Sequence, residues 1–269
     1  MRTCNNIHKI PTINEEYLQD NTQKKTIQSK SEYKKKYLLE KILIVEDNLN
    51  FANTLYETLN EFASEIIIAC DGQKALNIIN NLKPYIILLD LHIPKINGLK
   101  LLTQIKKGNN IIILSGQTKY INKIHIENYE IIKSVLIKPI DMKEVYNKVE
   151  YLLEQREKEK ITLNIKKILD NFEFNKTSNG YTYIVECLNE IVDEPLNLRN
   201  IENVLYKKVA SRHFNNNSHN VKWNIDKSLA SMCRYTEKNI LQRYFGNINN
   251  ITAKKFLREI YDVLQINGY

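Results

Sequence analysis

The sequence predicts an α/β domain with a parallel sheet, followed by an all-α domain. Two observations support this. Up to about residue 155, short apolar runs without polar interruption alternate with segments of helical periodicity, whereas the rest of the chain shows helical periodicity alone. Strands are expected near 41–46, 65–70, 85–90, 111–115 and 134–138, and helices near 49–62, 72–82, 97–107, 118–128 and 141–155. This alternation favours a five-unit sandwich in the flavodoxin-like order, and Asn48 is expected to cap its first helix.

Charge and polarity divide the chain into four parts. Residues 1–38 are polar and basic, and they hold too few apolar side chains to offset the entropy of ordering, so we expect a disordered extension. The α/β domain is expected over 39–156 and the helical domain over 164–269. The charge run that starts at Glu154 is most simply a helix end that continues as a solvated linker over 157–163.

Composition excludes several classes of protein. With 269 residues and 43% hydrophobic content, the chain can form two cores and is not disordered as a whole. No run approaches the roughly 18 apolar residues of a membrane span, and the N-terminus lacks a secretory core, so we expect a cytoplasmic protein without membrane contact. The four cysteines show no CxxC spacing, which predicts reduced thiols and no disulfide framework.

Residues with carboxylate, hydroxyl or ammonium side chains follow four of the predicted strands. These residues are Glu46-Asp47, Asp90, Ser115-Gly116 and Lys138-Pro139. Ligands bind at the carboxyl edge of open parallel sheets, so these side chains are expected to meet there. Carboxylates favour Mg²⁺, and a lysine with a hydroxyl can hold two phosphoryl oxygens. The set predicts phosphoryl transfer onto Asp90, a carboxylate nucleophile.

With these marks the α/β half resembles the receiver domain of two-component response regulators. The turn Ala-Cys-Asp-Gly at 69–72 and the segment LHIPKINGL after Asp90 add to the resemblance. The resemblance implies that Asp90 accepts a phosphoryl group from a histidine kinase or phosphotransfer protein. It further implies the following roles: Mg²⁺ binding by Glu46, Asp47, Asp90 and the backbone carbonyl of His92, phosphoryl binding by Ser115 and Lys138, and a cis bond before Pro139.

Two positions depart from the family pattern. Gly116 stands where alanine is commoner, and Val135 stands where receivers usually carry a switching tyrosine or phenylalanine. A valine cannot swing between exposed and buried rotamers with the same consequence. We therefore hypothesise that phosphorylation is coupled to the output through the loop that follows Ser115.

The second half of the chain predicts a bundle that contains a helix-turn-helix. Apolar side chains at helical spacing begin at Ile161, a third helix is expected over 198–213, and a fourth follows the polar run that ends at Ser218, its expected cap. Residues 201–260 hold eleven Lys or Arg against four Asp or Glu, which suggests a polyanionic partner such as DNA.

This half resembles the C-terminal effector domain of the stage-zero sporulation protein A family. The resemblance lies in NGYTYIVECLNE at 179–190, LYKKVASRHF at 205–214, VKWNIDKSL at 221–229, YFG at 244–246 and ITAKKFLREIYDVL at 251–264. It implies a six-helix domain that binds double-stranded DNA, with a recognition helix at about 218–232. Phosphorylated receivers are expected to pair as a homodimer on repeated or inverted half-sites.

The candidate DNA contacts fall into two groups. The outward face of the recognition helix carries His219, Asn220, Lys222, Trp223 and Lys227, which can contact bases and backbone. It also carries Asp226, whose charge would repel a phosphate. The preceding helix offers Lys207, Lys208 and Arg212 to phosphates. The arginines that the family presents to bases are missing, since Trp223 and Asp226 fall at or near those positions. Two alternatives stay open: Trp223 packs into the domain, and the basic residues form a solvated face.

These features predict a phosphorelay response regulator that controls transcription linked to sporulation. The rival interpretation is an adaptor or phosphate sink whose helical domain binds protein. An independent enzyme is not expected, because the sequence offers no second catalytic set.

Overall fold

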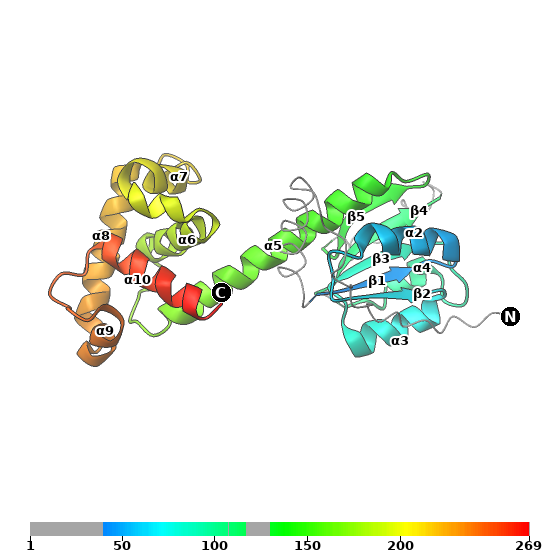
Figure 1. The fold of residues 1–269 in the computed structure, drawn as a ribbon, viewed down its shortest axis with the longest axis horizontal. Coiled ribbons are helices and arrows are strands. Elements are labelled where there is room, and N and C mark those ends of the chain that lie inside the picture. The colour runs from blue at the N-terminus through cyan, green and yellow to red at the C-terminus, as the bar shows by residue number, and fades with distance from the viewer. Residues whose placement is uncertain (1–39, 107, 117–129, 269) are drawn as a thin grey trace, which may run out of the picture. The chain divides into compact units, whose positions relative to one another are not determined.

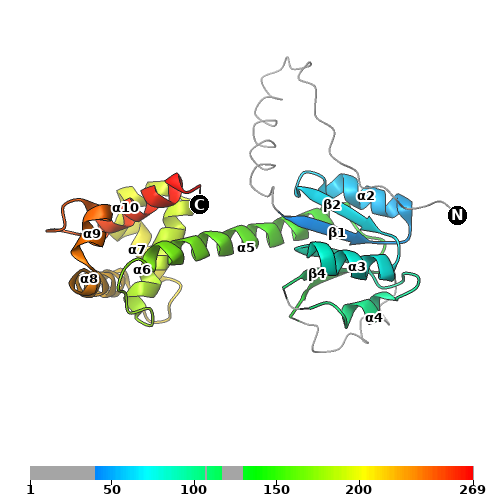
Figure 2. The same ribbon diagram turned by 90° about the horizontal axis from the view of Figure 1, so that it is seen from below.

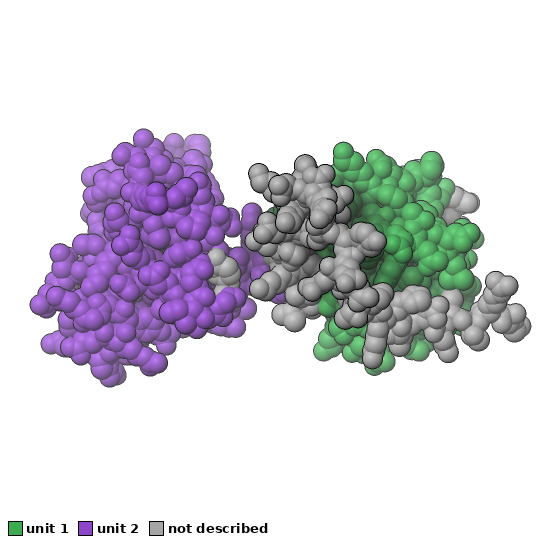
Figure 3. Space-filling view, viewed as in Figure 1, with its two compact units in different colours: residues 1–155 green, residues 156–269 purple. Residues whose placement is uncertain are grey.

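The computed structural model describes residues 40–106, 108–116 and 130–268, and the chain divides into two compact units, 1–155 and 156–269 (Figure 1, Figure 3). The expected extension over 1–38 and the expected helix over 118–128 lie outside the described residues. Within those described ranges, none of the helices combines the length and apolar character needed to cross a bilayer.

Unit 1 is built on a five-stranded parallel sheet. Its strands are β1 (Lys41–Val45), β2 (Glu65–Ala69), β3 (Ile86–Asp90), β4 (Asn110–Ser115) and β5 (Ile132–Ile137), in the order β2-β1-β3-β4-β5. This order confirms the flavodoxin-like prediction. The pairing register sets Asp90 beside Leu114, one residue before Ser115, so the polar residues that end these two strands lie at one edge.

Helices cover both faces of this sheet (Figure 1, Figure 2). One face carries α2 (Leu49–Leu59) and the start of α5 (Met142–Leu169), and the other carries α3 (Gly72–Leu82) and α4 (Gly98–Leu102). Successive side chains of a strand point to opposite faces. In β1, Ile42 and Ile44 pack in the α2 and α5 layer, whereas Leu43 and Val45 pack in the α3 and α4 layer.

Local capping explains where these helices begin. The Asn48 side chain accepts hydrogen bonds from the N–H groups of Asn50 and Phe51, which confirms its predicted role as the cap of α2. Asp71 and Asn97 cap α3 and α4 in the same way. Helix α4 is shorter than the predicted 97–107, because bonds to the third preceding residue tighten the chain into a turn after Leu102.

The fifth helix continues where a linker was expected. Helix α5 runs to Leu169 and therefore contains the predicted linker 157–163. No glycine or proline interrupts it, and the charged residues make pairs at i,i+3 spacing, Arg156 with Glu159 and Glu157 with Lys160. A run of alternating charge is compatible with a helix as well as with a linker, and here the helix forms.

Unit 2 is entirely helical over its described residues. It comprises the end of α5, α6 (Asn179–Asp193), a 3-10 turn η3 (Pro195–Arg199), a wide turn η4 (Ile201–Leu205), α7 (Tyr206–Ala210), α8 (Ser218–Tyr235), α9 (Lys238–Phe245) and α10 (Ala253–Ile266). The predicted single helix over 198–213 is broken, because Asn200 leaves helical geometry and its side chain caps the next turn. The cap of α8 is Asn217 and not Ser218.

The contact between α6 and α8 depends on Gly180. A Cβ atom added there would lie 2.2 Å from the carbonyl oxygen of Asn224 and 2.6 Å from the Cβ of Ser228. Since the nearest atom belongs to the backbone of α8, the helix itself would have to move. Gly180 therefore sets the position of α8 within unit 2.

We predict that Gly180→Ala destabilises the protein by about 1–3 kcal/mol, because overpacking outweighs the gain in helix propensity. The measurement is urea unfolding monitored by far-UV circular dichroism, which reports on the helices of both units. Gly116→Ala is the control, because a Cβ there meets nothing within 4 Å. A Gly180→Ala variant as stable as the wild type would contradict the close contact.

Candidate functional site

Three carboxylates converge at the carboxyl edge of the unit 1 sheet. Glu46 and Asp47 follow β1, and Asp90 ends the neighbouring strand β3. One oxygen from each of the three lies within 4.8 Å of the others. Glu46 is 1% exposed and Asp90 is 5% exposed, whereas Asp47 faces solvent. Adjacent strands with buried carboxylates at their ends thus form one acidic cluster.

Lys138 bridges the two buried carboxylates. It follows β5, and its Nζ donates hydrogen bonds of 2.6 Å to Glu46 Oε2 and 2.6 Å to Asp90 Oδ2. The same ammonium lies 4.6 Å from the ring centroid of Phe51, in the first turn of α2. The peptide bond between Lys138 and Pro139 is cis, as predicted.

Burial and charge shift the titration of this pair. Burial, reinforced by the charge of Asp90, raises the pKa of Glu46 in spite of the hydrogen bond from Lys138. Burial alone would lower the pKa of Lys138, but its hydrogen bonds to Asp90 and Glu46 outweigh that effect and raise it. Lys138 is therefore protonated at neutral pH. With every carboxylate ionised, the four side chains carry a formal net charge of −2, which a divalent cation would neutralise.

Backbone groups fix the loop that follows Asp90. The His92 N–H donates to Asp90 Oδ1 at 2.8 Å, and the His92 side chain is exposed. Gly98 is required where the loop enters α4, because an added Cβ would lie 2.5 Å from Leu91 Cα and 2.6 Å from the Asp90 carbonyl oxygen. Ser115 is buried at the end of β4, and its carbonyl accepts the Lys138 N–H at 2.8 Å.

The two positions that depart from the family pattern lie near this edge. Val135 is half-buried in β5 and packs with the α3 and α4 layer. Gly116 has open space on its side-chain side. The segment that follows it, 117–129, lies outside the described residues.

The candidate DNA-contacting face of α8 is exposed. His219, Asn220, Asp226 and Lys227 are solvent-exposed, and Trp223 is 55% exposed. Trp223 is therefore not a core residue of unit 2. The Lys227 Nζ lies 4.8 Å from its ring centroid, a cation–π contact within one helix face.

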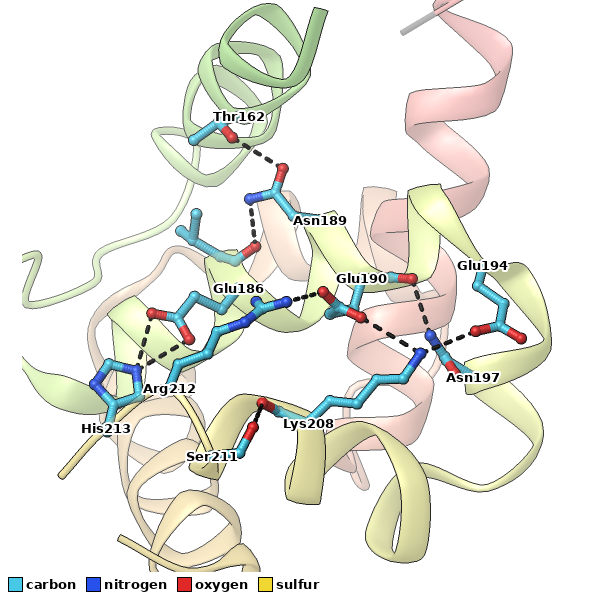
Figure 4. Close-up of polar contacts among 11 residues, drawn as sticks. Thr162, Glu186, Asn189, Glu190, Glu194, Asn197, Lys208, Ser211, Arg212 and His213 are labelled. Atoms are coloured by element: carbon cyan, nitrogen blue, oxygen red, sulfur yellow. Dashed lines mark hydrogen bonds and ion pairs between the residues drawn. The ribbon is translucent and has the colours of Figure 1, made fainter. Parts of the chain in front are cut away.

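The basic side chains near α7 have acidic partners within unit 2 (Figure 4). Lys208 contacts Glu194 at 2.9 Å and Glu190 at 3.6 Å, and Arg212 donates to Glu190. Of the remaining predicted phosphate contacts, Lys207 is exposed. Of these three cations, Lys207 and Lys208 of α7 and Arg212 just after it, two thus already lie against carboxylates.

Lys222 of α8, another predicted DNA contact, is paired in the same way, with Glu202. His213, which follows Arg212 and was not a predicted contact, lies 3.0 Å from Glu186. The sequence interpretation missed these acidic partners. A signal for three of them exists, because glutamates recur at every fourth position: Glu186 and Glu190 share one face of α6, and Glu194 caps its end. The contact between the Phe51 ring and the Lys138 ammonium was not predicted from the sequence either.

Comparison with known protein families matches both units. Residues 42–150 match the response regulator receiver domain, and residues 165–264 match the sporulation initiation factor Spo0A C-terminal domain. The chain thus carries a response regulator receiver domain followed by a Spo0A-type C-terminal domain.

Individual proteins are similar over parts of this chain. Response regulator ArlR of Staphylococcus saprophyticus is 32% identical over 143 residues, which are 52% of this chain and 64% of the relative. A probable transcriptional regulator, ycf27 of Cyanophora paradoxa, is 23% identical over 64% of this chain and 80% of its own length. The Francisella response regulator 1452 receiver domain is 27% identical over 44% of this chain and 98% of that domain, with a TM-score of 0.39.

We predict that Glu46→Gln stabilises unit 1 at pH 7 in the absence of divalent ions. The raised pKa means that the folded state binds a proton more readily than the unfolded state. The contribution of Glu46 to stability is therefore present below the unfolded pKa, near 4.5, and is lost as pH rises through the folded pKa.

Urea unfolding of both proteins between pH 4 and pH 8 checks this prediction. The advantage of Glu46→Gln should grow as the pH rises. Glu57→Gln, on the exposed side of α2, makes the same charge change and should show no such trend. A Glu46→Gln variant that is less stable at pH 7 than at pH 4, relative to wild type, would contradict it.

Proposed function

We propose that this response regulator accepts a phosphoryl group on Asp90 from a histidine kinase or phosphotransfer protein, and that its helical unit binds double-stranded DNA to regulate transcription linked to sporulation. One observation carries the proposal, the convergence of Glu46, Asp47, Asp90 and Lys138 at a single sheet edge.

The chemistry proposed for Asp90 is nucleophilic. A carboxylate oxygen attacks the phosphorus of a phosphohistidine donor, the P–N bond breaks, and the imidazole keeps the electron pair and takes up a proton. Lys138 already holds its ammonium 2.6 Å from Asp90 Oδ2 and supplies a fixed positive charge for a phosphoryl oxygen. The Ser115 hydroxyl, at the end of the neighbouring strand, is proposed to bind a second oxygen.

The acidic cluster fits Mg²⁺. This ion favours hard oxygen ligands and usually binds through one or two carboxylates, waters and a phosphate. We propose Glu46, Asp47, Asp90 and the His92 carbonyl as its ligands. When bound, Mg²⁺ offsets the negative charge shared by the cluster and the incoming phosphoryl group.

We predict that acetyl phosphate with Mg²⁺ adds one phosphoryl group to the wild-type protein and none to Asp90→Asn, as measured by intact mass spectrometry. Asp141→Asn, an exposed carboxylate in the same unit, is the matched control and should be modified like the wild type. Sedimentation of the beryllofluoride-treated protein should show a dimer. An unmodified wild type, or equal modification of Asp90→Asn, would refute the phosphoacceptor.

DNA binding is proposed through the exposed face of α8, with Asn220, Trp223 and Lys227 at the bases. The basic side chains in and just after α7 are proposed to contact phosphates. In the structure, Lys208 and Arg212 form ion pairs with Glu190 and Glu194, which therefore compete with phosphates for them. A phosphate that replaces these partners must first separate the pairs. The acidic face of α6 should therefore weaken DNA binding.

We predict that Glu190→Gln tightens DNA binding and steepens its dependence on salt, because it frees Arg212 and part of the Lys208 charge for phosphates. Gel shifts against a genomic fragment library at several salt concentrations measure both effects. Glu237→Gln, an exposed carboxylate at the start of α9, is the charge-matched control. An unchanged affinity for Glu190→Gln would place these cations away from the DNA.

A second function is supported by the same ion pairs. Because Lys208, Arg212 and Lys222 are partly neutralised within unit 2, the helical unit has fewer free cations than its sequence suggests. This favours an adaptor or phosphate sink whose helical unit binds protein. Absence of binding to the fragment library at low salt, for wild type and Glu190→Gln alike, would favour this alternative.

A further inference from the structure

A further buried carboxylate lies outside the acidic cluster, at the turn between β2 and α3. Asp71 is 4% exposed, and its Oδ1 accepts the Lys74 N–H at 2.8 Å, which caps α3. Its other oxygen, Oδ2, contacts the Lys95 Nζ at 2.7 Å. Lys95 belongs to the loop 91–97 that follows Asp90, so this ion pair joins two loops at the functional edge of the sheet.

Two backbone contacts reinforce the same junction. The Gly72 N–H donates to the Pro94 carbonyl at 3.2 Å. A Cβ added at Gly72 would lie 1.9 Å from the Ile96 carbonyl oxygen, so glycine alone permits this approach. The turn 71–72 therefore contacts three successive residues of the loop.

Lys95 adopts a backbone conformation that its surroundings must maintain. Its φ of 65° lies in the left-handed region, which a lysine adopts only at an energetic cost. The ion pair with Asp71 forms in this conformation and offsets its energetic cost. Burial raises the pKa of Asp71, but the hydrogen bonds from Lys95 and the Lys74 N–H outweigh it and lower the pKa. Asp71 is thus ionised at neutral pH and available to hold Lys95.

The loop that Lys95 belongs to carries groups of the proposed site. It contains His92, whose N–H donates to Asp90 and whose carbonyl is a proposed Mg²⁺ ligand. It is followed by Gly98, whose N–H donates to the Leu91 carbonyl at 3.1 Å. A loop held at both ends and at its middle can keep the His92 carbonyl in one position.

We propose that Asp71 is a positioning residue for phosphoryl transfer: through Lys95 it holds the loop that aims the His92 carbonyl at the Mg²⁺ site. This inference rests on the proposed function. It assigns to the turn before α3 a role in metal affinity, beyond its role in starting the helix.

The variant Asp71→Asn separates these two roles. Asparagine caps helices about as well as aspartate, so α3 should keep its start, but the amide carries no charge to hold Lys95. In the full chain we expect Mg²⁺ binding, measured by isothermal titration calorimetry, to weaken about 10-fold or more. The rate of modification by acetyl phosphate at subsaturating Mg²⁺ should fall in proportion. The urea midpoint without Mg²⁺ should fall only modestly, because the Lys95 side chain is 59% exposed, so the variant should remain folded in both assays.

Two further variants sharpen the experiment. Lys95→Gln should cause the same loss, and the double variant should lose no more than either single variant, because both remove one interaction. Lys41→Gln is the matched control: it breaks the Lys41–Glu65 pair of 3.0 Å in the same unit and should leave Mg²⁺ affinity within about twofold.

The outcomes separate the inference from the proposed function. Mg²⁺ binding by wild type and equally by Asp71→Asn would overturn the inference alone, as would a loss explained by the fraction of unfolded protein. A wild type that neither binds Mg²⁺ nor accepts a phosphoryl group would overturn the proposed function and this inference with it.

Discussion

The bridge from Lys138 to Glu46 and Asp90 is the interaction on which the site depends. Two carboxylates at the ends of adjacent strands lie almost entirely out of water, and buried charges of like sign are unfavourable unless a partner compensates them. The lysine supplies that partner from β5, two strands away from β3 across β4. The strand order of the sheet is therefore what allows a single cation to reach both acids.

The rest of unit 1 keeps those acids in place. Strands β1 and β3 are buried on both faces, so their ends move little, whereas the loops that extend from them need separate support. Glycines give part of that support, because Gly72 and Gly98 let backbone segments approach at distances that any side chain would prevent. The functional edge is thus a rigid sheet with loops that are held by close backbone contacts.

The elements that could be predicted from the sequence are those whose signal is local. Uninterrupted apolar runs locate the five strands, and the residues that end those runs identify Glu46, Asp90 and Lys138 as neighbours once a parallel sheet is assumed. Asn48 is a local signal of the same kind and caps α2. The structure of the charged run that starts at Glu154 was harder to predict, since the same pattern occurs in linkers and in exposed stretches of helix.

Tertiary pairing was beyond such reasoning. Whether Lys208 and Arg212 face solvent or face α6 depends on how the helices pack, and nothing in their own segment specifies it. The same holds for Asp71, which appears in the sequence as part of a family turn. Its contact with Lys95 becomes visible only when loops that are 24 positions apart are placed side by side.

Both units use carboxylates to hold basic side chains, but burial gives the pairs different consequences. Glu46 and Asp90 are almost completely buried, so removing Lys138 would leave uncompensated charge in a medium that solvates it poorly. In unit 2 the side chains of Lys208 and Arg212 are 41% and 47% exposed, and exposed ion pairs contribute little to stability. The Glu190 side chain, however, is only 12% exposed, so a polyanion that takes its place leaves a largely buried carboxylate without its partners, which is the cost that Glu190→Gln removes. The bridge in unit 1 opens only to a group that brings its own compensating charge, as a phosphoryl group accompanied by a divalent cation does.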